Sequence, residues 1–440
     1  MNNYTIEEVT QYIKENDVKF IRLAFCDIFG NMKNVSIMPS ELDRAFKSGI
    51  PFDASAVRGF MDVEDSDLFL FPDPTTLQIL PWRPSQGRVA RFFCDIKMPD
   101  GAPFGGNGRE ILRRAIEKAK LLGYTVKIGT ECEFYLFELD ENGKPTRNTH
   151  DKAGYFDIAP LDKGETVRRE ICLTLEEMDM MPEMSHHEQG KGQHEVDFRY
   201  SEALTAADNL VNFKSVVKNI AARNGLYASF MPKPILEDSG SGLHINMSLF
   251  KDGVNVFDLS KSNLKNESGC FVAGIIAHIK EMSAFTNPLT NSYARLGEFS
   301  APKYITWSHG NRSQLIRIPA SYGEFKRMEL RNPDPSCSPY LTFALLIHAG
   351  IDGITTGKVL SEPTNCNLFK ADKKLLNTLP KMPDNLGEAI IVARASTFIP
   401  EVIPRDTFDR YLAEKEIEWQ EYLDSKDKEY FEIEKYFERV

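Results

Sequence analysis

Two glutamates, Glu131 and Glu133, stand one residue apart inside the aromatic and β-branched run of residues 126–137. Such a run is typical of a buried strand. Side chains at positions i and i+2 of a strand share one face, so the two carboxylates are expected to point the same way. A buried carboxylate is costly to keep ionised unless positive charge or hydrogen-bond donors compensate it. The chain must therefore fold so that this strand faces cations.

Three further segments carry acidic, histidine or arginine side chains at similar spacing: His187-Glu188 with His194-Glu195, His244 to Ser248, and Arg327-Met328-Glu329-Leu330-Arg331. One Glu-x-Glu pair alone is usually the solvated face of a strand. Four coincident segments instead predict one site with five carboxylates and a histidine. This oxygen-rich set favours Mg²⁺ or Mn²⁺ over zinc. The neighbouring arginines indicate an anionic substrate, most simply a polyphosphate carried by the metals.

Length and composition fit an enzyme of ordinary size. The chain has 440 residues, which makes two domains the default expectation, and a net charge of -11. That charge argues against a nucleic-acid surface. Seven cysteines without a Cys-x-x-Cys pair indicate reduced thiols and a cytoplasmic location. No targeting segment is recognised and the apolar stretches are too short to span a bilayer, so no membrane association is expected.

Local patterns predict a small sheet-and-helix unit followed by a larger α+β body. Thr5 to Glu8 is a capping box, residues 19–25 alternate like a strand, and Phe29-Gly30-Asn31 predicts a hairpin turn into residues 33–37. The run from Pro99 to Pro103 marks the boundary between domains 1–102 and 103–440. The larger domain is expected to have mainly antiparallel strands. Its helices are expected near 108–122, 166–178, 205–223, 266–284, 338–356 and 405–424.

The chain resembles type I glutamine synthetase over nearly its whole length, and specifically the short subtype that is not adenylylated. Nine segments carry the resemblance in order and spacing: Phe52-Asp53-Ala54-Ser55, Glu131-Cys132-Glu133-Phe134, Ser185-His186-His187-Glu188, Gly192-Gln193-His194-Glu195, Phe230 to Pro234, Gly240 to His244, Asn311-Arg312-Ser313, Arg317-Ile318-Pro319 and Arg327 to Arg331. The resemblance implies a β-grasp-like N-terminal domain and a catalytic domain whose antiparallel strands form a funnel surrounded by helices. It also implies two stacked hexameric rings, with each active site completed by the N-terminal domain of a neighbour.

Carried over residue by residue, the resemblance implies two metal sites for Mg²⁺ or Mn²⁺. One would be made by Glu133, Glu188 and Glu195, and the other by Glu131, His244 and Glu329. The substrate glutamate would meet Gly240, Arg295 and Arg331, with His244 and Glu131 on the same side. The nucleotide would meet Glu183, Tyr200, Ser248, Arg317 and Arg327. Alternation from Glu195 turns Tyr200 to the opposite face, so its place rests on the resemblance alone.

The implied reaction is a two-step ligation with ATP as co-substrate. A free carboxylate is a poor acyl donor, so ATP would first convert the γ-carboxylate of glutamate into an acyl phosphate. Ammonia would then displace phosphate to give glutamine. Arg312 would act on the phosphates, and Asp53 would receive the proton that ammonium must lose. The partners implied are glutamate, ammonium, ATP and other copies of the chain.

The sequence departs from the family at several positions. The family's flexible loop usually ends in a glutamate directly before Ala-Pro, whereas Ser300 precedes Ala301 here and Glu298 stands two residues earlier. Glu298 is therefore the candidate for the missing acid. Ser239 replaces an asparagine that binds substrate. Asp62 replaces an arginine tied to glutamine feedback in some members, and Phe369 offers no hydroxyl for adenylylation.

Two alternatives stay open. A γ-glutamyl ligase that uses an organic amine would keep the ATP and metal parts unchanged. A weakly active homologue could instead serve as the nitrogen-sensing partner of a regulatory protein, an idea that Ser300 suggests. His186 is expected to be a packed or solvated neighbour of the site, because adjacent strand residues point to opposite faces.

Overall fold

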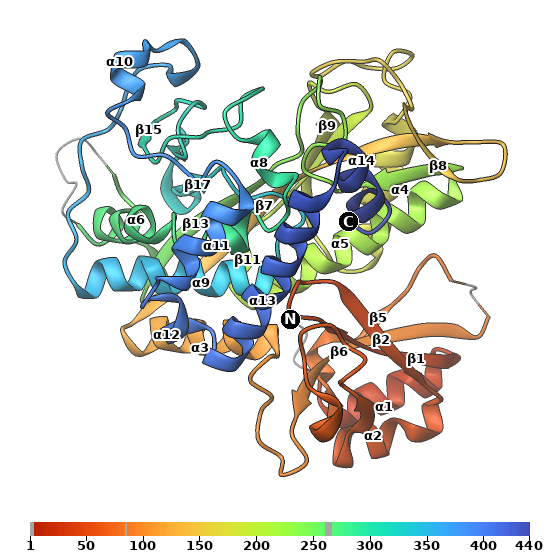
Figure 1. The fold of residues 1–440 in the computed structure, drawn as a ribbon. Coiled ribbons are helices and arrows are strands. Elements are labelled where there is room, and N and C mark those ends of the chain that lie inside the picture. Colours follow the sequence, from red (N-terminus) through yellow and green to blue (C-terminus); the bar gives the residue numbers. More distant parts are fainter. Residues whose placement is uncertain (1–3, 84–85, 260–265) are drawn as a thin grey trace.

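The structure is a computed structural model that describes residues 4–83, 86–259 and 266–440. It divides into a small N-terminal part and a larger body (Figure 1). In the small part, helices α1 (Ile6–Glu15) and α2 (Leu42–Ser48) accompany one sheet. Its strands are β1 (Val18–Cys26), β2 (Met32–Ile37), β3 (Ile50–Asp53), β4 (Asp67–Pro72), β5 (Gln78–Ile79) and β6 (Arg88–Lys97). They follow the order β2-β1-β6-β4-β3, with β5 beside β6 and only the β1–β6 pair parallel among those described.

Local sequence signals explain how this small part begins. Thr5 and Glu8 form the predicted capping box at the start of α1. The predicted hairpin between β1 and β2 is also confirmed. The buried carboxylate of Asp27 accepts the backbone N–H groups of Phe29 and Asn31, which fixes the turn. Both motifs depend on residues only a few positions apart, which is why the sequence reveals them.

The larger body is built on a second sheet whose centre is the long strand β7 (Tyr124–Leu139). The main path runs β15-β16-β17-β13-β7-β10-β9, with β8, β11 and β12 also pairing with β7 and β14 pairing with β13. The remaining bounds are β8 (Pro145–Thr149), β9 (Pro182–His187), β10 (Gln193–Phe198), β11 (Ser201–Glu202), β12 (Leu226–Ser229), β13 (Leu243–Lys251), β14 (Val254–Asn255), β15 (Trp307–His309), β16 (Ile316–Ile318) and β17 (Met328–Leu330). Every described pair except β15–β16 is antiparallel. The predicted α+β class with mainly antiparallel strands is confirmed.

Helices pack around this sheet (Figure 1). The longer ones are α3 (Gly108–Leu121), α4 (Glu165–Glu177), α5 (Ala203–Arg223), α6 (Glu267–His278), α9 (Pro339–Thr355) and α13 (Arg405–Asp424). Shorter ones are α7 (Ser283–Thr286), α8 (Ser292–Arg295), α10 (Lys373–Leu376), α11 (Leu386–Arg394), α12 (Ile399–Val402) and α14 (Lys428–Glu432). Helices α3 and α5 contact β7, and α9 packs against α3 and α6. Helix α9 is buried along nearly its whole length, so it forms the centre of the helical layer.

One arginine joins the two parts of the chain. Arg109 on α3 is 3% exposed and forms ion pairs with Asp73 and Asp95 of the small part, at 3.2 and 3.5 Å. Its guanidinium also pairs at 2.9 Å with Asp208 on α5. A buried charge is tolerated only when it is paired in this way, so these contacts fix the small sheet against the larger body. The division at residues 102 and 103 stays a prediction.

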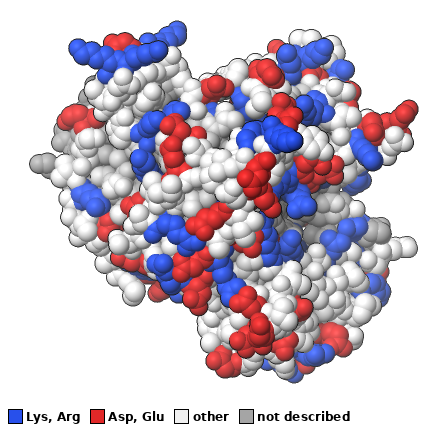
Figure 2. All heavy atoms as spheres, in the orientation of Figure 1, with Lys and Arg blue, Asp and Glu red and all other residues white. Residues whose placement is uncertain are grey.

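The surface carries charge of both signs. Figure 2 shows lysine and arginine interspersed with aspartate and glutamate over one face, rather than gathered into a single basic region. Among the described residues, no helix combines the length and the apolar character needed to cross a membrane.

Candidate active site

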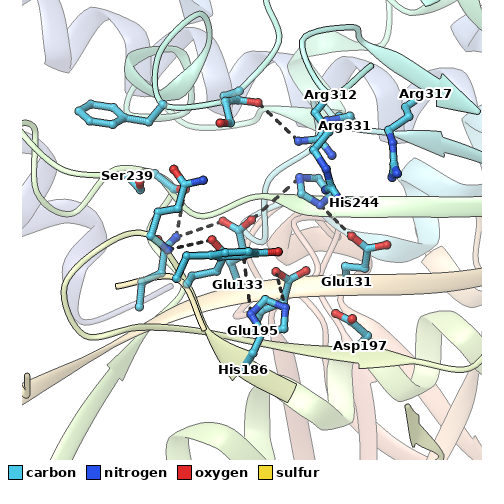
Figure 3. A pocket seen from close by; sticks show the side chains of 18 of the residues that line it. Glu131, Glu133, His186, Glu195, Asp197, Ser239, His244, Arg312, Arg317 and Arg331 are labelled. Atoms are coloured by element: carbon cyan, nitrogen blue, oxygen red, sulfur yellow. Dashed lines mark hydrogen bonds and ion pairs between the residues drawn. The ribbon is translucent and has the colours of Figure 1, made fainter. Parts of the chain in front are cut away.

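The strand register brings the acidic side chains together. In the antiparallel pairing of β7 with β10, Glu133 lies opposite Glu195 and Glu131 lies opposite Asp197. On the next strand, β9, His186 lies opposite Glu195. Residues directly opposite each other share one face of a sheet. Glu133, Glu195 and His186 therefore form one row across the sheet, and Figure 3 shows them on the same side of the pocket.

A second row runs in the other direction from β7. His244 on β13 lies opposite Glu131, and its Nδ1 is 3.1 Å from the Glu131 carboxylate. Glu329 on β17 joins the same group, since ligand atoms of Glu131, His244 and Glu329 lie within 4.8 Å of one another. Glu329 is fully buried and pairs with both Arg317 and Arg331. The predicted two-residue alternation at Glu131 and Glu133 and at Arg327 to Arg331 thus holds.

The charges of the two rows are balanced differently. Burial opposes ionisation of Glu131, yet its hydrogen bond with His244 lowers the pKa of this carboxyl to about 2. Burial and the neighbouring carboxylates raise the pKa of Glu133 and of Glu195. Burial and the charge of Glu131 likewise raise the pKa of Asp197 to about 8. The positive charge near Glu133 and Glu195 therefore does not offset their burial and mutual repulsion.

Divalent cations fit this deficit. Three groups of potential ligands face the cavity among the described residues: Glu131, His244 and Glu329; Glu133, Glu195 and His244; and His186, Glu188 and Glu195. Within each group the candidate ligand atoms lie within 4.8 Å of one another. A nearby hard cation favours the ionised form of a carboxylate whose pKa is raised, because the cation takes the place of the proton. The arrangement suits two or more such ions.

The opposite wall of the cavity is basic. The cavity has a volume of about 380 Å³ and is lined by five arginines, Arg295, Arg312, Arg317, Arg327 and Arg331. The guanidinium of Arg295 is 3% exposed and donates to the backbone carbonyls of Arg331, Asn332 and Pro333. A Cβ at Gly240 would lie 2.8 Å from Arg295 Cγ, so only glycine lets the chain pass this close. Anionic groups of a substrate can bind between this wall and the cations.

Most of the predicted site residues meet in this cavity. Its lining includes Glu131, Glu133, Glu188, Glu195, Gly240, His244, Arg295, Arg312, Arg317, Arg327 and Arg331, and Glu329 lies directly behind. Glu183, Tyr200 and Ser248 are outside the lining. Ser248 Oγ donates to the carbonyl of Lys326, and the hydroxyl of Tyr200 donates to Glu324, so both lie beside the segment that leads to Arg327.

Two predicted catalytic acids are also outside the lining. Asp53 ends β3 in the small part, is exposed, and accepts hydrogen bonds from the backbone and hydroxyl of Ser55. The side chain of Glu298 is 61% exposed and lies 3.7 Å from the buried ammonium of Lys233. Ser300, in contrast, lines the cavity.

His186 is a packed neighbour of Glu188, as expected, but it faces the cavity rather than away from it. The side chain lines the cavity, with Nε2 3.6 Å from Glu195 and Nδ1 3.8 Å from Glu188. Alternation in fact holds here: His186 and Glu188 stand two residues apart and both line the cavity, whereas His187 between them faces the buried Asp151. His186 shares its face with Glu195 through cross-strand pairing.

The lining residues that the sequence analysis did not assign include Gln193, Asp197 and Tyr155. Gln193 and Asp197 alternate with Glu195 along β10, so the same spacing argument could have found them. Gln193 donates to Glu133 at 3.1 Å. Tyr155 enters the cavity from the loop between β8 and α4, where no periodic signal exists.

Comparisons with known proteins agree over the whole chain. Residues 17–99 match the family described as glutamine synthetase, beta-Grasp domain, and residues 105–436 match glutamine synthetase, catalytic domain. The chain is 49% identical to glutamine synthetase of Clostridium saccharobutylicum, with 96% of each chain covered. It is 48% identical to that of Methanosarcina mazei, with 95% of each chain covered.

Solved structures agree as well. A GmaS–ADP complex superposes with a TM-score of 0.87 at 28% identity, covering 97% of this chain and 98% of the other. Plasmodium falciparum glutamine synthetase, determined by electron cryomicroscopy, superposes with a TM-score of 0.85 at 27% identity and the same coverage.

Asp197→Asn should stabilise the metal-free protein increasingly as pH rises. With its pKa raised to about 8, folded Asp197 keeps a proton that the unfolded chain releases near its ordinary pKa of about 4. The wild type therefore loses stability as pH rises from about 4 to about 8, whereas asparagine does not titrate. Melting temperatures of EDTA-treated protein should diverge steadily between pH 5 and pH 8, with the variant higher.

The matched control for this measurement is Asp252→Asn, at an exposed position in the β13–β14 turn. Its melting temperature should follow the wild type at every pH. A difference for Asp197→Asn that does not change with pH would contradict the prediction.

Proposed function

The chain belongs to the glutamine synthetase family and is an ATP-dependent glutamate–ammonia ligase, and we propose that the cavity described above is where it makes glutamine. The observation that carries the proposal is one cavity with a carboxylate wall facing an arginine wall. The first wall suits metal ions and an ammonium ion. The second suits glutamate and the phosphates of ATP.

We propose that two or more Mg²⁺ or Mn²⁺ ions belong to the carboxylate wall. Glu133, Glu188 and Glu195 would hold one ion, and Glu131, His244 and Glu329 would hold another. When bound, such ions neutralise the phosphates of ATP and orient them for transfer. His186 lies between Glu188 and Glu195 and borders the first of these sites.

Glutamate is proposed to bind at Arg295, Arg331 and the backbone of Gly240. Arg295 is buried, and its hydrogen bonds go to backbone carbonyls rather than to a carboxylate. Burial lowers the pKa of this guanidinium. A carboxylate of the substrate would supply the negative charge that the guanidinium lacks. The side-chain carboxylate of glutamate would then extend toward Glu131 and His244.

The nucleotide is proposed to lie along Arg312, Arg317 and Arg327, with its remaining part toward Glu183, Tyr200 and Ser248. In the first step a γ-carboxylate oxygen of glutamate bonds to the terminal phosphorus of ATP, and the bond to the leaving ADP oxygen breaks. In the second step ammonia bonds to the acyl carbon and inorganic phosphate leaves. Arg312 would stabilise charge on the transferred phosphoryl group, since positioning and charge stabilisation supply most of the catalysis in such transfers.

Asp53 is proposed to act in the cavity of a neighbouring subunit. It is exposed at the end of β3 and is not among the residues that line the cavity of its own chain. Hydrogen bonds from Ser55 lower the pKa of Asp53, so it is ionised and can attract ammonium. This arrangement requires an oligomer, which we propose to be a dodecamer of two hexameric rings.

We propose that Glu298 supplies the loop acid that Ser300 cannot. Serine does not accept a proton near neutral pH. Glu298 rests 3.7 Å from Lys233, outside the cavity, so the loop has to turn for the carboxylate to enter. Two residues of extended chain span about 6 to 7 Å, which is within reach of a mobile loop.

One observation favours the alternative of an organic amine. Ser300 lines the cavity where the family usually has glutamate. The side chain at this position is therefore smaller than glutamate and uncharged. An alkyl group on the amine could occupy the space. A cytoplasmic location and a regulatory protein partner remain proposals from the sequence.

The purified protein should form glutamine from glutamate, ammonium and ATP only with Mg²⁺ or Mn²⁺ present. The reason is that the carboxylate wall cannot accept ATP without cations. The assay is amide formation with and without EDTA, followed by re-addition of metal, across ammonium, methylamine, ethylamine and putrescine. Undiminished turnover in EDTA would contradict the metal sites, and faster turnover with an organic amine would assign the enzyme to the rival ligase.

Mixed oligomers test the shared site. Asp53→Ala and Glu329→Ala subunits should each be inactive alone, because each lacks one residue of every site. In rings assembled at random from equal amounts, about a quarter of the sites combine both wild-type residues, if each site takes Asp53 from a neighbour. Activity near that level is expected after co-assembly. Activity no greater than the sum of the separate variants would indicate that each chain builds its own site.

Glu298→Gln should lower amide formation at least tenfold, about 1.4 kcal/mol of barrier, with little change in ATP binding. Glutamine keeps the size of the side chain but can neither accept the proton nor attract ammonium. Introducing Ser300→Glu into this variant should restore part of the rate. If Glu298→Gln has no kinetic effect while Ser300→Glu alone raises turnover strongly, Glu298 does not take part.

A further inference from the structure

A buried cluster of charged and histidine side chains lies beside the β9–β10 hairpin, away from the cavity. Its members are Asp151, Asp162, Arg168, His187 and His194, and all five are buried. The reaction proposed above uses none of them. We infer that Asp151 is a positioning residue for the known reaction. Its carboxylate joins the hairpin that carries Glu188 to the loop that carries Tyr155, so both side chains face the cavity in a fixed geometry.

The carboxylate of Asp151 is fully buried, and both of its oxygens accept hydrogen bonds. Oδ1 accepts from His187 Nε2 at 2.9 Å, from the backbone N–H of Gly192 at 3.1 Å and from that of Ala153 at 3.2 Å. Oδ2 accepts from the backbone N–H of Lys163 at 3.0 Å. The side chain is 0% exposed, so water does not share these contacts. Every partner is a donor, and an ionised carboxylate is the side chain that offers only acceptors.

The contacts to Ala153 and Lys163 close the base of a loop. These two residues lie near the two ends of the segment 151–164, which follows β8 and precedes α4. Within it, Tyr155 lines the cavity, and the backbone N–H of Phe156 donates to the carbonyl of His187 at 3.1 Å. Asp151 therefore fixes where the loop leaves the sheet, and hence where Tyr155 enters the site.

The contacts to His187 and Gly192 fix the hairpin from the other side. His187 lies between Asp151 and the carbonyl of Glu188, which its Nδ1 contacts at 2.7 Å. Gly192 lies in the turn between β9 and β10, and Glu188 is closed onto this turn by its hydrogen bond to the carbonyl of Gln193. Glu188 itself is the first residue after β9, where the turn of the hairpin begins. The carboxylate of Asp151 thus adds a contact on each side of this turn, at His187 and at Gly192.

The same cluster could be taken for a third cation site, because Asp151, Asp162, His187 and His194 place ligand atoms within 4.8 Å of one another. Arg168 argues against that reading. Its Nη1 lies 2.9 Å from His194 Nδ1 and 2.8 Å from Asp162, so a guanidinium already occupies the place of a cation. A Cβ at Gly164 would lie only 2.5 Å from His194 Nε2, so the backbone closes the remaining side of the ring.

Asparagine is the informative replacement. It has the size of aspartate, but its amide NH₂ group would meet three of the four N–H donors in one orientation and the fourth in the other. A carboxylate that served only to fill space would tolerate this change. A carboxylate that positions the hairpin and the loop would not, and Glu188 would lose its place beside Glu195. Residues that orient metal ligands commonly change metal affinity by about 10- to 100-fold when mutated.

The test is Mn²⁺ binding to the full-length, ATP-free protein, followed by the electron paramagnetic resonance of free Mn²⁺. Asp151→Asn should weaken the class of sites that contains Glu188 at least tenfold and leave the class at Glu131, His244 and Glu329 within about twofold. The matched control is Asp27→Asn, because Asp27 is also a buried carboxylate that accepts two backbone N–H groups, but in the small part. That variant should keep both affinities.

The possible Mn²⁺-binding results distinguish failure of the proposed function from failure of the positioning role of Asp151. The inference rests on the proposed function for the role of Glu188. A wild type that binds no Mn²⁺ would overturn both, whereas a wild type and an Asp151→Asn variant with equal Mn²⁺ affinities would overturn the positioning role alone. If Asp151→Asn does not assemble, His187→Leu breaks the link to the carbonyl of Glu188 and should weaken the same class of sites. Unchanged affinities in His187→Leu would then contradict the inference.

Discussion

Repulsion between like charges on one face of the larger sheet is the constraint on which the site depends. Glu131 and Glu329 are relieved by His244 and by Arg317 and Arg331. Glu133, Glu195 and Asp197 are not relieved to the same degree, which is why the pKa of each is raised. A sheet built only for stability would not keep such a row. Its persistence in the fold makes sense when metal ions, and the substrate that they carry, complete the charge balance.

Local patterns were sufficient for much of the fold. The capping box at Thr5, the hairpin at Asp27 and helices such as α13 each depend on residues close in sequence. The alternation of Glu131 with Glu133 also survives, because β7 is long and regular. Helix 266–284 was predicted as one element, but the structure has α6 and α7 with a break between them.

What the sequence could not reveal was set by contacts between distant segments. His186 reaches the cavity because β9 pairs with β10 in a register that places it opposite Glu195. Tyr155 reaches it because Asp151 fixes a loop that has no periodic pattern of its own. Register and loop closure depend on pairs that the chain brings together only in the folded state, so a single sequence does not determine them by spacing.

In the proposed oligomer, the two parts of the chain would contribute to the active sites of different subunits. Arg109 joins Asp73 and Asp95 of the small sheet to Asp208 of the body within a buried network. The small sheet is therefore held rigidly on its own body, with Asp53 exposed at its edge. Because the small sheet is fixed in this way, it cannot rotate to place Asp53 in the cavity of its own chain. It suits the proposal that Asp53 serves the cavity of a neighbouring subunit, whose carboxylates would contact an ammonium ion from the other side.

Backbone conformation indicates how the loop at Ser300 takes part. Phe299 and Ser300 have φ values of 42° and 71°, a backbone region that residues other than glycine rarely adopt. Gly297, two residues before Phe299, has a φ of 96°. The loop is held in this form by the buried Lys233, whose ammonium pairs with Glu298 and lies 4.2 Å from the ring centre of Phe299. Strained residues held by a few side-chain contacts can change conformation when those contacts are exchanged. A negatively charged acyl phosphate in the cavity would compete with Glu298 for the nearby positive charges, which would free the carboxylate at the step that needs a base.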